Sequence, residues 1–438
     1  MKKIRAFTIP LLMALLLLAG AIPSGAAVYF QCPGNVVGDL DGDGMLRADV
    51  QVGGSWEIEI EDLETNNPND LINPQPVVCM HLTGGDGFAV MADGVTQYLF
   101  SFTNVTGVDD ADVMTIGALS AEWPAPTIEL KEGDEFYLTL SNVGMQIRPD
   151  LFDPHTVHYH GFPQSSNIYD GLPESGLSIN MGASLTYYYK NVDPGTYMYH
   201  CHVEATEHMQ MGMLGNLYVH PAQNGNTTLY PSGLFAYNDG DGSTGYDVDY
   251  PIQLGGFDRE FHDASYDVQP LPFATMWDEY PMINGRGYPD TALAEYDPAD
   301  PATVIPAPAE ANPIDGVSTQ KVTSRITATA GQRVLLRISN LNVTRFHTLA
   351  STIPMQVVGK DARLLRGADP DGNGPLLGEN LYYTTSSVTI GGGESFDVFL
   401  DTTGLASGAT HFLYTTNMNL LSNDTQDFGG MMTEIHIN

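Results

Sequence analysis

Residues 127–140 read TIELKEGDEFYLTL, two short runs rich in β-branched and aromatic residues on either side of Gly133-Asp134. Each run has the length of a strand, and the Gly-Asp pair between them is typical of a turn. Runs of this kind recur along the chain, and beyond the N-terminal apolar run we find no long segment of helical periodicity. The pattern predicts an all-β protein built from β-sandwich domains.

The N-terminus combines a basic start with a short apolar run, Leu11 to Ala19. The run is too short to cross a bilayer, and the small residues Ser24-Gly25-Ala26 suit cleavage by signal peptidase. We therefore expect residues 1–26 to be a signal peptide and the mature protein to be secreted or periplasmic. No later segment has the ~20 consecutive apolar residues of a membrane helix, so no membrane span is expected.

The remaining chain is longer than a single hydrophobic core usually organises, which predicts two domains in series. We expect an acidic N-terminal extension over residues 27–75, a first sandwich over 76–222 and a second over 228–438. Residues 131–138 and 329–336 resemble each other, and Ser-Asn follows both. This echo indicates duplication of one sandwich.

The charge balance is strongly acidic, with 17 Lys and Arg against 53 Asp and Glu and a formal net charge of −36. Such a surface repels nucleic acid and anionic membranes, so neither is an expected partner. It would attract metal ions or cationic proteins, or it would simply keep an exported protein soluble. Both interpretations stay open at this point.

Three cysteines in an exported protein leave one unpaired. Cys32 and Cys79 both lie in the N-terminal region, whereas Cys201 stands within a cluster of histidines. We therefore expect a disulfide between Cys32 and Cys79 and a metal-binding thiolate at Cys201. The alternative for Cys201 is an unpaired buried thiol without function.

Two histidine-rich stretches carry the functional information, residues 155–161 (HTVHYHG) and 199–213 (YHCHVEATEHMQMGM). Side chains alternate in direction along a strand, so His158 and His160 share one face while His155 projects from the other. By the same rule His200 and His202 share a face, and Cys201 between them points the opposite way. One pair of strands could thus serve two separate metal sites.

Two imidazoles, a thiolate and a thioether form a donor set that suits copper cycling between two oxidation states. His155, Cys201, His208 and Met213 supply this set. Zinc is the competing metal, and the methionine and the surplus of histidines argue against it. Met209 and Met211 are interpreted as packing residues, because only Met213 follows the glycine that lets the chain turn toward the metal.

These motifs resemble the copper signatures of the multicopper oxidases, the laccase-like family. The resemblance extends through WPAPT at 123–127, GTYMY at 195–199, INGR at 283–286 and GGGESFDV at 391–398. It implies two cupredoxin-like Greek-key domains, the first binding copper and the second lacking a type 1 site.

Carried over residue by residue, the family pattern implies that His155, Cys201, His208 and Met213 bind type 1 copper. It implies that His158, His160, His200 and His202 form half of a three-copper cluster of type 2 and type 3 ions that reduces dioxygen. The chain departs from the family in its second half, where the stretches at 345–350 and 416–419 contain no His-x-His pair. Two-domain relatives complete such sites between subunits, so a homotrimer is compatible with the resemblance.

The leading functional hypothesis is a copper oxidoreductase that takes single electrons from a phenolic or metal-ion reductant and delivers them to dioxygen. Two alternatives stay open. One is a blue-copper electron-transfer or copper-binding protein that has lost oxidase activity, which the missing half-site favours. The other is a copper nitrite reductase, which would use His160, His200 and a second-domain histidine, although Met418 stands at the expected position of that histidine. The remaining histidines, at 81, 220, 262, 347, 411 and 436, are expected to be structural.

Two Asp-rich runs, Asp39 to Gly44 and Asp369 to Gly374, open like calcium-binding loops. Val50 and Asn380 occupy the twelfth positions, where a bidentate glutamate is expected. Calcium binding and ordinary Asp-Gly turns both stay open, and the missing glutamates favour turns.

Overall fold

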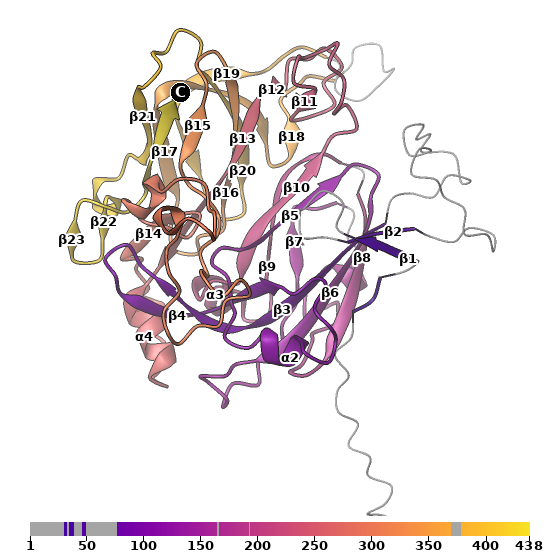
Figure 1. Ribbon diagram of the computed structural model, residues 1–438, viewed down its shortest axis with the longest axis vertical. Helices are drawn as coiled ribbons and strands as arrows, with labels where there is room; N and C mark the ends of the chain where they lie inside the picture. The colour runs from indigo at the N-terminus through magenta and orange to yellow at the C-terminus, as the bar shows by residue number, and fades with distance from the viewer. Residues whose placement is uncertain are drawn as a thin grey trace, which may run out of the picture.

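The computed structural model describes residues 30–32, 35–38, 46–49, 77–163, 166–191, 193–368 and 378–438. Strands β1 to β24 are the main regular elements of these ranges (Figure 1). The short α-helices are α2 (Val113–Ile116), α3 (Ala205–Gln210) and α4 (Arg259–Tyr266). Within the described ranges, no helix has the length and apolar character that crossing a membrane requires. The all-β prediction is confirmed, whereas the expected signal peptide (1–26) lies outside the described residues.

The first half of the fold is a sandwich of two sheets. One sheet has the order β1-β2-β3-β6-β8, with β4 also paired to β3, and the other has the order β5-β10-β9-β7. Their bounds are β1 Asn35–Gly38, β2 Leu46–Asp49, β3 Val77–Val90, β4 Thr96–Asn104, β5 Ala125–Lys131, β6 Glu135–Gly144, β7 His158–His160, β8 Ser184–Lys190, β9 Gly195–His200 and β10 Leu214–His220. Alternate residues of β6, Phe136 and Leu138, share one buried cluster with Ile128 of β5 and Leu217 of β10. The alternation of residues 127–140 therefore fills the core between the sheets.

The second half is built on one large sheet of order β14-β13-β16-β20-β17-β21-β24-β15, with β18 and β19 also paired to β17. The bounds are β13 Val248–Phe257, β14 Tyr280–Ile283, β15 Ile326–Ala328, β16 Arg333–Asn340, β17 His347–Lys360, β18 Arg363–Leu364, β19 Tyr383–Ile390, β20 Ser395–Asp401, β21 Thr410–Thr415 and β24 Met432–Ile437. Two small hairpins complete it, β11 (Leu234–Phe235) with β12 (Gly245–Tyr246), and β22 (Ser422–Asn423) with β23 (Gln426–Asp427). A second buried cluster, including Ile338, Val357 and Leu413, fills its interior.

Strand pairing repeats between the two halves. In the first, β5 runs parallel to β10, which pairs antiparallel with β9, and β9 with β7. In the second, β15 runs parallel to β24, which pairs antiparallel with β21, and β21 with β17. Gly133 and Gly331 occupy equivalent turns in the two halves, with φ of 99° and 96°, a conformation that glycine adopts without strain. The repeated topology agrees with the duplication predicted from the sequence echo; the boundaries at 76–222 and 228–438 stay predictions.

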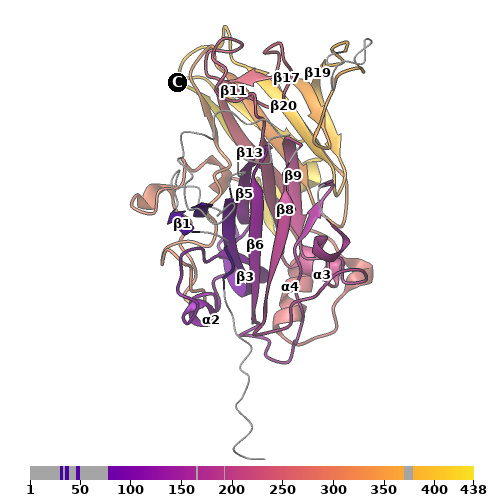
Figure 2. The same ribbon diagram turned by 90° about the vertical axis from the view of Figure 1, so that its right-hand side faces the viewer.

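The two halves lie one above the other along the long axis of the molecule (Figures 1 and 2). A buried apolar cluster joins them, with Trp123 and Met198 from the first half and Phe257 and Met282 from the second. The Trp123 and Phe257 rings stack with their centroids 4.5 Å apart. The junction is therefore packed like a domain core.

The N-terminal segment is held on the first sandwich by the predicted disulfide. Cys32 and Cys79 are bonded, with their Cα atoms 5.7 Å apart, and Cys201 is free and buried. Beside this bond the Phe30 ring stacks on His81 at 5.5 Å, which covers a buried imidazole. The pairing predicted for the three cysteines is confirmed.

His81 makes the stability of this region depend on pH. Burial lowers the pKa of His81 to about 4, against the weaker opposing effect of Asp110. The unfolded chain, with an ordinary histidine pKa of 6.5, binds more protons than the folded one between these values. We therefore expect His81 to leave the free energy of unfolding unchanged above pH 6.5. As the pH falls to about 4, it should lower that free energy progressively, by up to about 3 kcal/mol. Urea unfolding at a series of pH values measures this.

The matched variant is His81→Gln, whose amide does not titrate and can still meet the Ser141 hydroxyl, 2.7 Å from His81 Nε2 in the folded protein. The free energy of unfolding should fall less steeply for His81→Gln than for the unsubstituted protein between pH 6.5 and 4. Equal slopes for both proteins would contradict the assignment.

Of the three Asp-rich runs, the structure describes one. The runs Asp39–Gly44 and Asp369–Gly374 lie outside the described residues, so calcium binding there stays a prediction. In the related run 239–242, the Asp239 carboxylate accepts backbone N–H groups from Asp241 at 2.9 Å and Gly242 at 2.7 Å. This carboxylate closes a turn, as expected for an Asp-Gly sequence.

Candidate metal centre

The pairing of β9 with β10 brings both ends of the loop 201–213 together. His200, the last residue of β9, lies opposite Leu214, the first residue of β10. One step further, the Cys201 N–H donates to the Met213 carbonyl at 3.1 Å. Gly212 turns the chain with a φ of +115°, and a side chain there would meet the Phe100 carbonyl at 2.9 Å. Met213 thus returns to a position beside Cys201, as its glycine predicts.

Three of the four predicted type 1 donors form one buried group. The Cys201 Sγ lies 3.2 Å from His208 Nδ1 and 3.9 Å from His155 Nδ1, and the donor atoms all fall within 4.8 Å of one another. Met213 is fully buried in the same apolar cluster as Cys201. Two imidazoles and a thiolate with no water access, beside a buried thioether, fit copper.

Charge around Cys201 matches a metal-binding thiolate. Burial alone would raise the pKa of the Cys201 thiol, but the charge of His208 and hydrogen bonds from His155 and His208 outweigh it and hold that pKa well below its usual range. Burial would likewise favour neutral His208, yet Cys201 and the nearby Asp153 raise the pKa of His208 to about 10. Both shifts favour a thiolate beside an imidazolium, and copper binding at this pair would displace a proton from His208.

Two neighbours of this group were not identified from the sequence. The Thr156 N–H points at the Cys201 Sγ at 3.5 Å, and the Thr156 hydroxyl accepts the His202 N–H at 3.1 Å. Thr156 therefore links the two histidine-rich segments and orients the sulfur. The Asp153 carboxylate lies 3.8 Å from His208 Nε2. The one sequence feature that could have indicated Thr156 and Asp153 is their closeness to His155 in the chain.

The other four predicted ligands form a second group on the opposite side of the strands. His158 of β7 pairs in register with His200 of β9. The His158 ring centroid lies 5.2 Å from those of His200 and His202, and the His160 centroid lies 5.9 Å from those of His158 and His200. The alternation rule thus separates the two groups as expected, and we call the second one the histidine cluster.

Backbone hydrogen bonds fix two of these rings. His158 Nδ1 lies 2.6 Å from the Asp170 carbonyl, and His200 Nδ1 lies 2.8 Å from the Cys201 carbonyl. A ring that donates from Nδ1 leaves Nε2 as a lone-pair donor for a metal. Burial lowers the pKa of His200 to about 3, so this imidazole is neutral and able to ligate at neutral pH.

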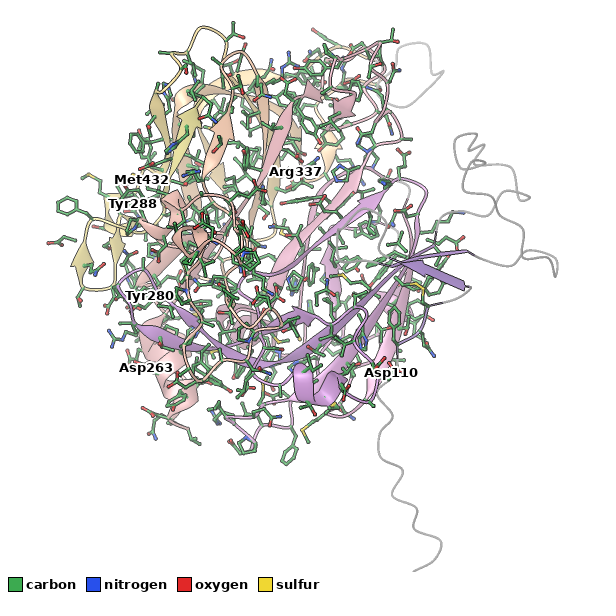
Figure 3. All side chains as sticks on the ribbon, viewed as in Figure 1. Asp110, Asp263, Tyr280, Tyr288, Arg337 and Met432 are labelled. Atoms are coloured by element: carbon green, nitrogen blue, oxygen red, sulfur yellow. A yellow bond between two sulfur atoms is a disulfide. The ribbon has the colours of Figure 1, made fainter. Side chains whose placement is uncertain are left out.

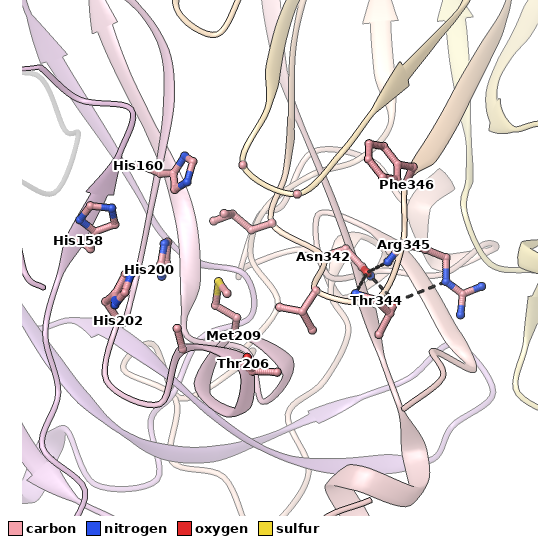
Figure 4. Close-up of a pocket in the computed structure, with 15 residues that line it drawn as sticks. His158, His160, His200, His202, Thr206, Met209, Asn342, Thr344, Arg345 and Phe346 are labelled. Atoms are coloured by element: carbon pink, nitrogen blue, oxygen red, sulfur yellow. Dashed lines mark hydrogen bonds between the residues drawn. The ribbon is translucent and has the colours of Figure 1, made fainter. Parts of the chain in front are cut away.

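The histidine cluster forms one wall of a cavity of about 560 Å³ (Figure 4). Part of the wall belongs to helix α3, through Ala205, Thr206 and Met209. The opposite wall comes from the second half of the chain and consists of Leu341, Asn342, Val343, Thr344, Arg345, Phe346, Gly392 and Gly393. Figure 4 shows the four imidazoles facing this second wall across the open space. None of the residues that line the second wall is a histidine.

Gly393 touches the histidine cluster directly. Its φ is +88°, and a Cβ added there would lie 2.6 Å from His160 Cε1. We expect Gly393→Ala to displace His160 and to lower the copper content of the histidine cluster, at a stability cost of about 1–3 kcal/mol. Copper analysis and the type 1 absorption of the same sample measure this, because the Cys201 site should be retained.

The matched control is Gly404→Ala. Gly404 has a similar φ of +79°, but a Cβ there would have nothing within 4 Å. It therefore carries the backbone strain without the clash, and its copper content should equal that of the unsubstituted protein. Equal copper contents for both variants would show that Gly393 does not position His160.

The histidines expected to be structural are mostly hydrogen-bonded away from both groups. His262 lies within 3.0 Å of the Gln210 carbonyl and 2.6 Å of the Tyr98 carbonyl, and His220 and His436 lie 3.1 Å and 2.6 Å from glutamates. His347 differs, because both its ring nitrogens are buried without a hydrogen-bond partner. His347 does not line the cavity of the histidine cluster.

Strand register explains why the second half lacks a matching group. The Thr415 N–H donates to the Met431 carbonyl at 2.9 Å as the Cys201 N–H does to Met213, so the pairing of His158 with His200 corresponds to that of Ala350 with Tyr414. The residues after Tyr414 are Thr415 and Thr416, where the first half has Cys201 and His202. The duplicated strands are present, but their metal-ligating side chains are not.

Comparison with known proteins identifies the segment that holds the predicted ligands. Residues 103–224 match the family model described as multicopper oxidase. The chain is 34% identical over 126 residues to the iron transport multicopper oxidase fetC of Epichloe festucae, covering 27% of this chain and 18% of that protein. It is 30% identical over 143 residues to the laccase abr2 of Aspergillus fumigatus, covering 32% and 22%. The matched segments thus span about a fifth of the length of these relatives.

Solved structures extend the likeness of fold to most of the chain. The blue copper oxidase from Nitrosomonas europaea superimposes with a TM-score of 0.56 at 21% identity, covering 82% of this chain and 85% of that one. The copper nitrite reductase from Nitrosomonas europaea superimposes with a TM-score of 0.50 at 17% identity, covering 83% and 94%. At these identities the likeness concerns the fold. The match to the multicopper oxidase family model at residues 103–224 includes all eight predicted ligands.

Proposed function

We propose that this protein is a secreted or periplasmic copper oxidoreductase that passes single electrons from a reductant to dioxygen. In this proposal His155, Cys201, His208 and Met213 hold a type 1 copper, and His158, His160, His200 and His202 hold the copper that meets the acceptor. Copper supplies a one-electron redox couple in a donor set of this kind. The disulfide between Cys32 and Cys79 supports an oxidising compartment outside the cytoplasm.

The observation that carries the proposal is the position of Cys201 between His200 and His202. Its sulfur joins one buried group, while the two flanking imidazoles line the cavity on the opposite side. A single peptide unit on each side therefore connects the thiolate to each imidazole through covalent bonds. A structural cysteine would need no such arrangement.

The reductant is proposed to be a phenol or a reduced metal ion. The relatives include proteins named laccase and iron transport multicopper oxidase, so their names do not decide between the two reductants. The net charge of −36 favours a cationic reductant, because an acidic surface raises the local concentration of cations. A homotrimer, in which a neighbouring subunit covers the histidine cluster, is part of the same proposal.

A specific observation favours a second candidate, a blue-copper carrier without oxidase activity. The cavity wall from the second half contains no histidine, so the residues that line this cavity offer only the four histidines of the first half, half of the number that a three-copper site would need. The third candidate, a nitrite reductase, is less favoured. It leaves His158 and His202 without a role, and Met418 stands where it needs a histidine.

The deciding experiment follows oxygen uptake and electron paramagnetic resonance in one sample of copper-loaded protein, with a phenol and with Fe²⁺ as reductants. A type 1 signal with reductant-dependent oxygen uptake supports the oxidase. A type 1 signal without oxygen uptake establishes the carrier instead, and nitrite consumption without oxygen uptake establishes the nitrite reductase.

A further inference from the structure

Met209 lies between the two groups of ligands. It follows His208 on helix α3, and consecutive side chains on a helix diverge. His208 is buried against Cys201, whereas Met209 is half-buried and lines the cavity together with all four residues of the histidine cluster. Figure 4 shows the Met209 sulfur projecting into the cavity that His200 and His202 also line.

Packing alone accounts for the neighbouring methionines but not for this one. Met211 and Met213 are completely buried in the apolar core of the first sandwich. Met209 contacts the apolar cluster at the junction of the two halves only from its margin. A side chain that fills space in a core has no need to present sulfur to a cavity lined by imidazoles.

The polar groups of the opposite wall are already engaged. The Asn342 side chain donates to Asp278 at 2.8 Å and accepts the Thr344 N–H at 2.8 Å, and the Thr344 hydroxyl also donates to Asp278. The guanidinium of Arg345 is a cation and stacks over Trp277 at 4.1 Å. Among the residues that line the cavity, Met209 therefore provides the one soft, neutral donor besides the imidazoles.

We propose that the Met209 thioether is a ligand of the copper held by the histidine cluster. A thioether beside imidazoles selects Cu(I) over Cu(II), because soft ligands favour the softer ion. This inference rests on the proposed copper function and adds a ligand that replaces part of the missing second-half donor set. It predicts a cavity that retains copper most tightly in the reduced state.

The test compares Cu(I) and Cu(II) affinities of the full-length protein in a Cys201→Ser background, which removes the type 1 thiolate. Cu(I) affinity is measured by competition with a chromophoric Cu(I) chelator, and Cu(II) affinity with a Cu(II) chelator. We expect Met209→Leu to weaken Cu(I) binding at least about tenfold. Loss of a residue that only hydrogen-bonds a metal ligand typically weakens metal binding by about 10–100-fold, and loss of the ligand itself should cost at least as much. The Cu(II) affinity should change much less.

Met211→Leu is the matched control, since it makes the same substitution two residues away without touching the cavity. Its Cu(I) affinity should stay within about twofold, because Leu and Met have similar volumes. In a His202→Ala background, Met209→Leu should have little further effect, because the two ligands share one ion. Equal Cu(I) affinities for the Met209 and Met211 variants would overturn the proposal, as would equal losses of Cu(I) and Cu(II).

A second measurement keeps the outcome readable if either affinity variant folds poorly. X-ray absorption of the Cu(I)-loaded Cys201→Ser protein should contain a copper–sulfur component that decreases in Met209→Leu and persists in Met211→Leu. The type 1 absorption of the Cys201-containing Met209→Leu protein should be unchanged. Absence of that absorption in the unsubstituted protein would defeat the proposed function without bearing on Met209.

Discussion

Replacing Cys201 with serine is expected to abolish the blue absorption and reduce turnover to the background of copper-free protein. The thiolate is the donor that gives type 1 copper its character, and a serine hydroxyl in the same buried position does not ionise. The His155 and His208 rings would keep their positions, since backbone pairing of Cys201 with Met213 does not involve the side chain. Visible absorption, copper content and oxygen uptake measure the loss.

Serine is close to cysteine in size, so the fold should survive the substitution. Met211→Leu, in the same loop, should retain both colour and turnover. The histidine cluster lies on the other side of the strand, and copper bound there should remain in Cys201→Ser. Blue absorption that persists in Cys201→Ser would exclude Cys201 as a ligand.

The second large effect concerns stability at the junction of the two halves. We expect Arg337→Met to lower the free energy of unfolding by about 3–5 kcal/mol, because it leaves a buried carboxylate without its cation. Arg337, labelled in Figure 3, is 1% exposed and bonds Asp249 at 2.8 Å. Its guanidinium lies over the Tyr218 ring of the first half at 5.0 Å. Urea unfolding measures the change.

Asp397 is the buried carboxylate that would lose its neighbouring positive charge in Arg337→Met. It is completely buried, 3.9 Å from Arg337, and it accepts the Thr196 hydroxyl of the first half at 2.6 Å. Burial already raises its pKa, against the opposing charge of Arg337. In Arg337→Met this carboxyl must protonate or the junction must open.

Two companion variants separate charge burial from general damage. Adding Asp397→Asn to Arg337→Met should recover part of the loss, since no buried charge then remains. Arg259 pairs with Asp424 at 2.5 Å but is 41% exposed, and Arg259→Met should cost about 1 kcal/mol or less. Equal costs for Arg337→Met and Arg259→Met would contradict the role assigned to the buried pair.

Much of the fold follows from local pattern. Residues 127–140 alternate because every second side chain of a strand enters the core, and β5 and β6 form where that alternation predicts them. The two ligand groups likewise follow from alternation: Cys201 points one way and its two histidine neighbours the other. These predictions succeed because they depend only on residues that are close in sequence.

Other parts of the site depend on contacts that no local pattern contains. Gly393 lies 233 positions from His160, and the sequence around Met209 does not reveal the cavity that it lines. Arg337 and Asp397 meet residues of the first half only after the two sandwiches pack. The disulfide between Cys32 and Cys79 was predictable because Cys201, the only other cysteine in the sequence, stands among histidines and was predicted to bind metal.

The sequence by itself determined the strand texture and the separation of Cys201 from the histidines on the opposite face, since a period of two is a property of the extended backbone; the type 1 donor set stays a prediction. The tertiary structure alone decided what faces the histidine cluster. The second wall of the cavity, residues 341–346 with Gly392 and Gly393, comes from the other half of the chain. Its position depends on how the two halves of the chain pack, which is a balance of long-range contacts rather than of local geometry.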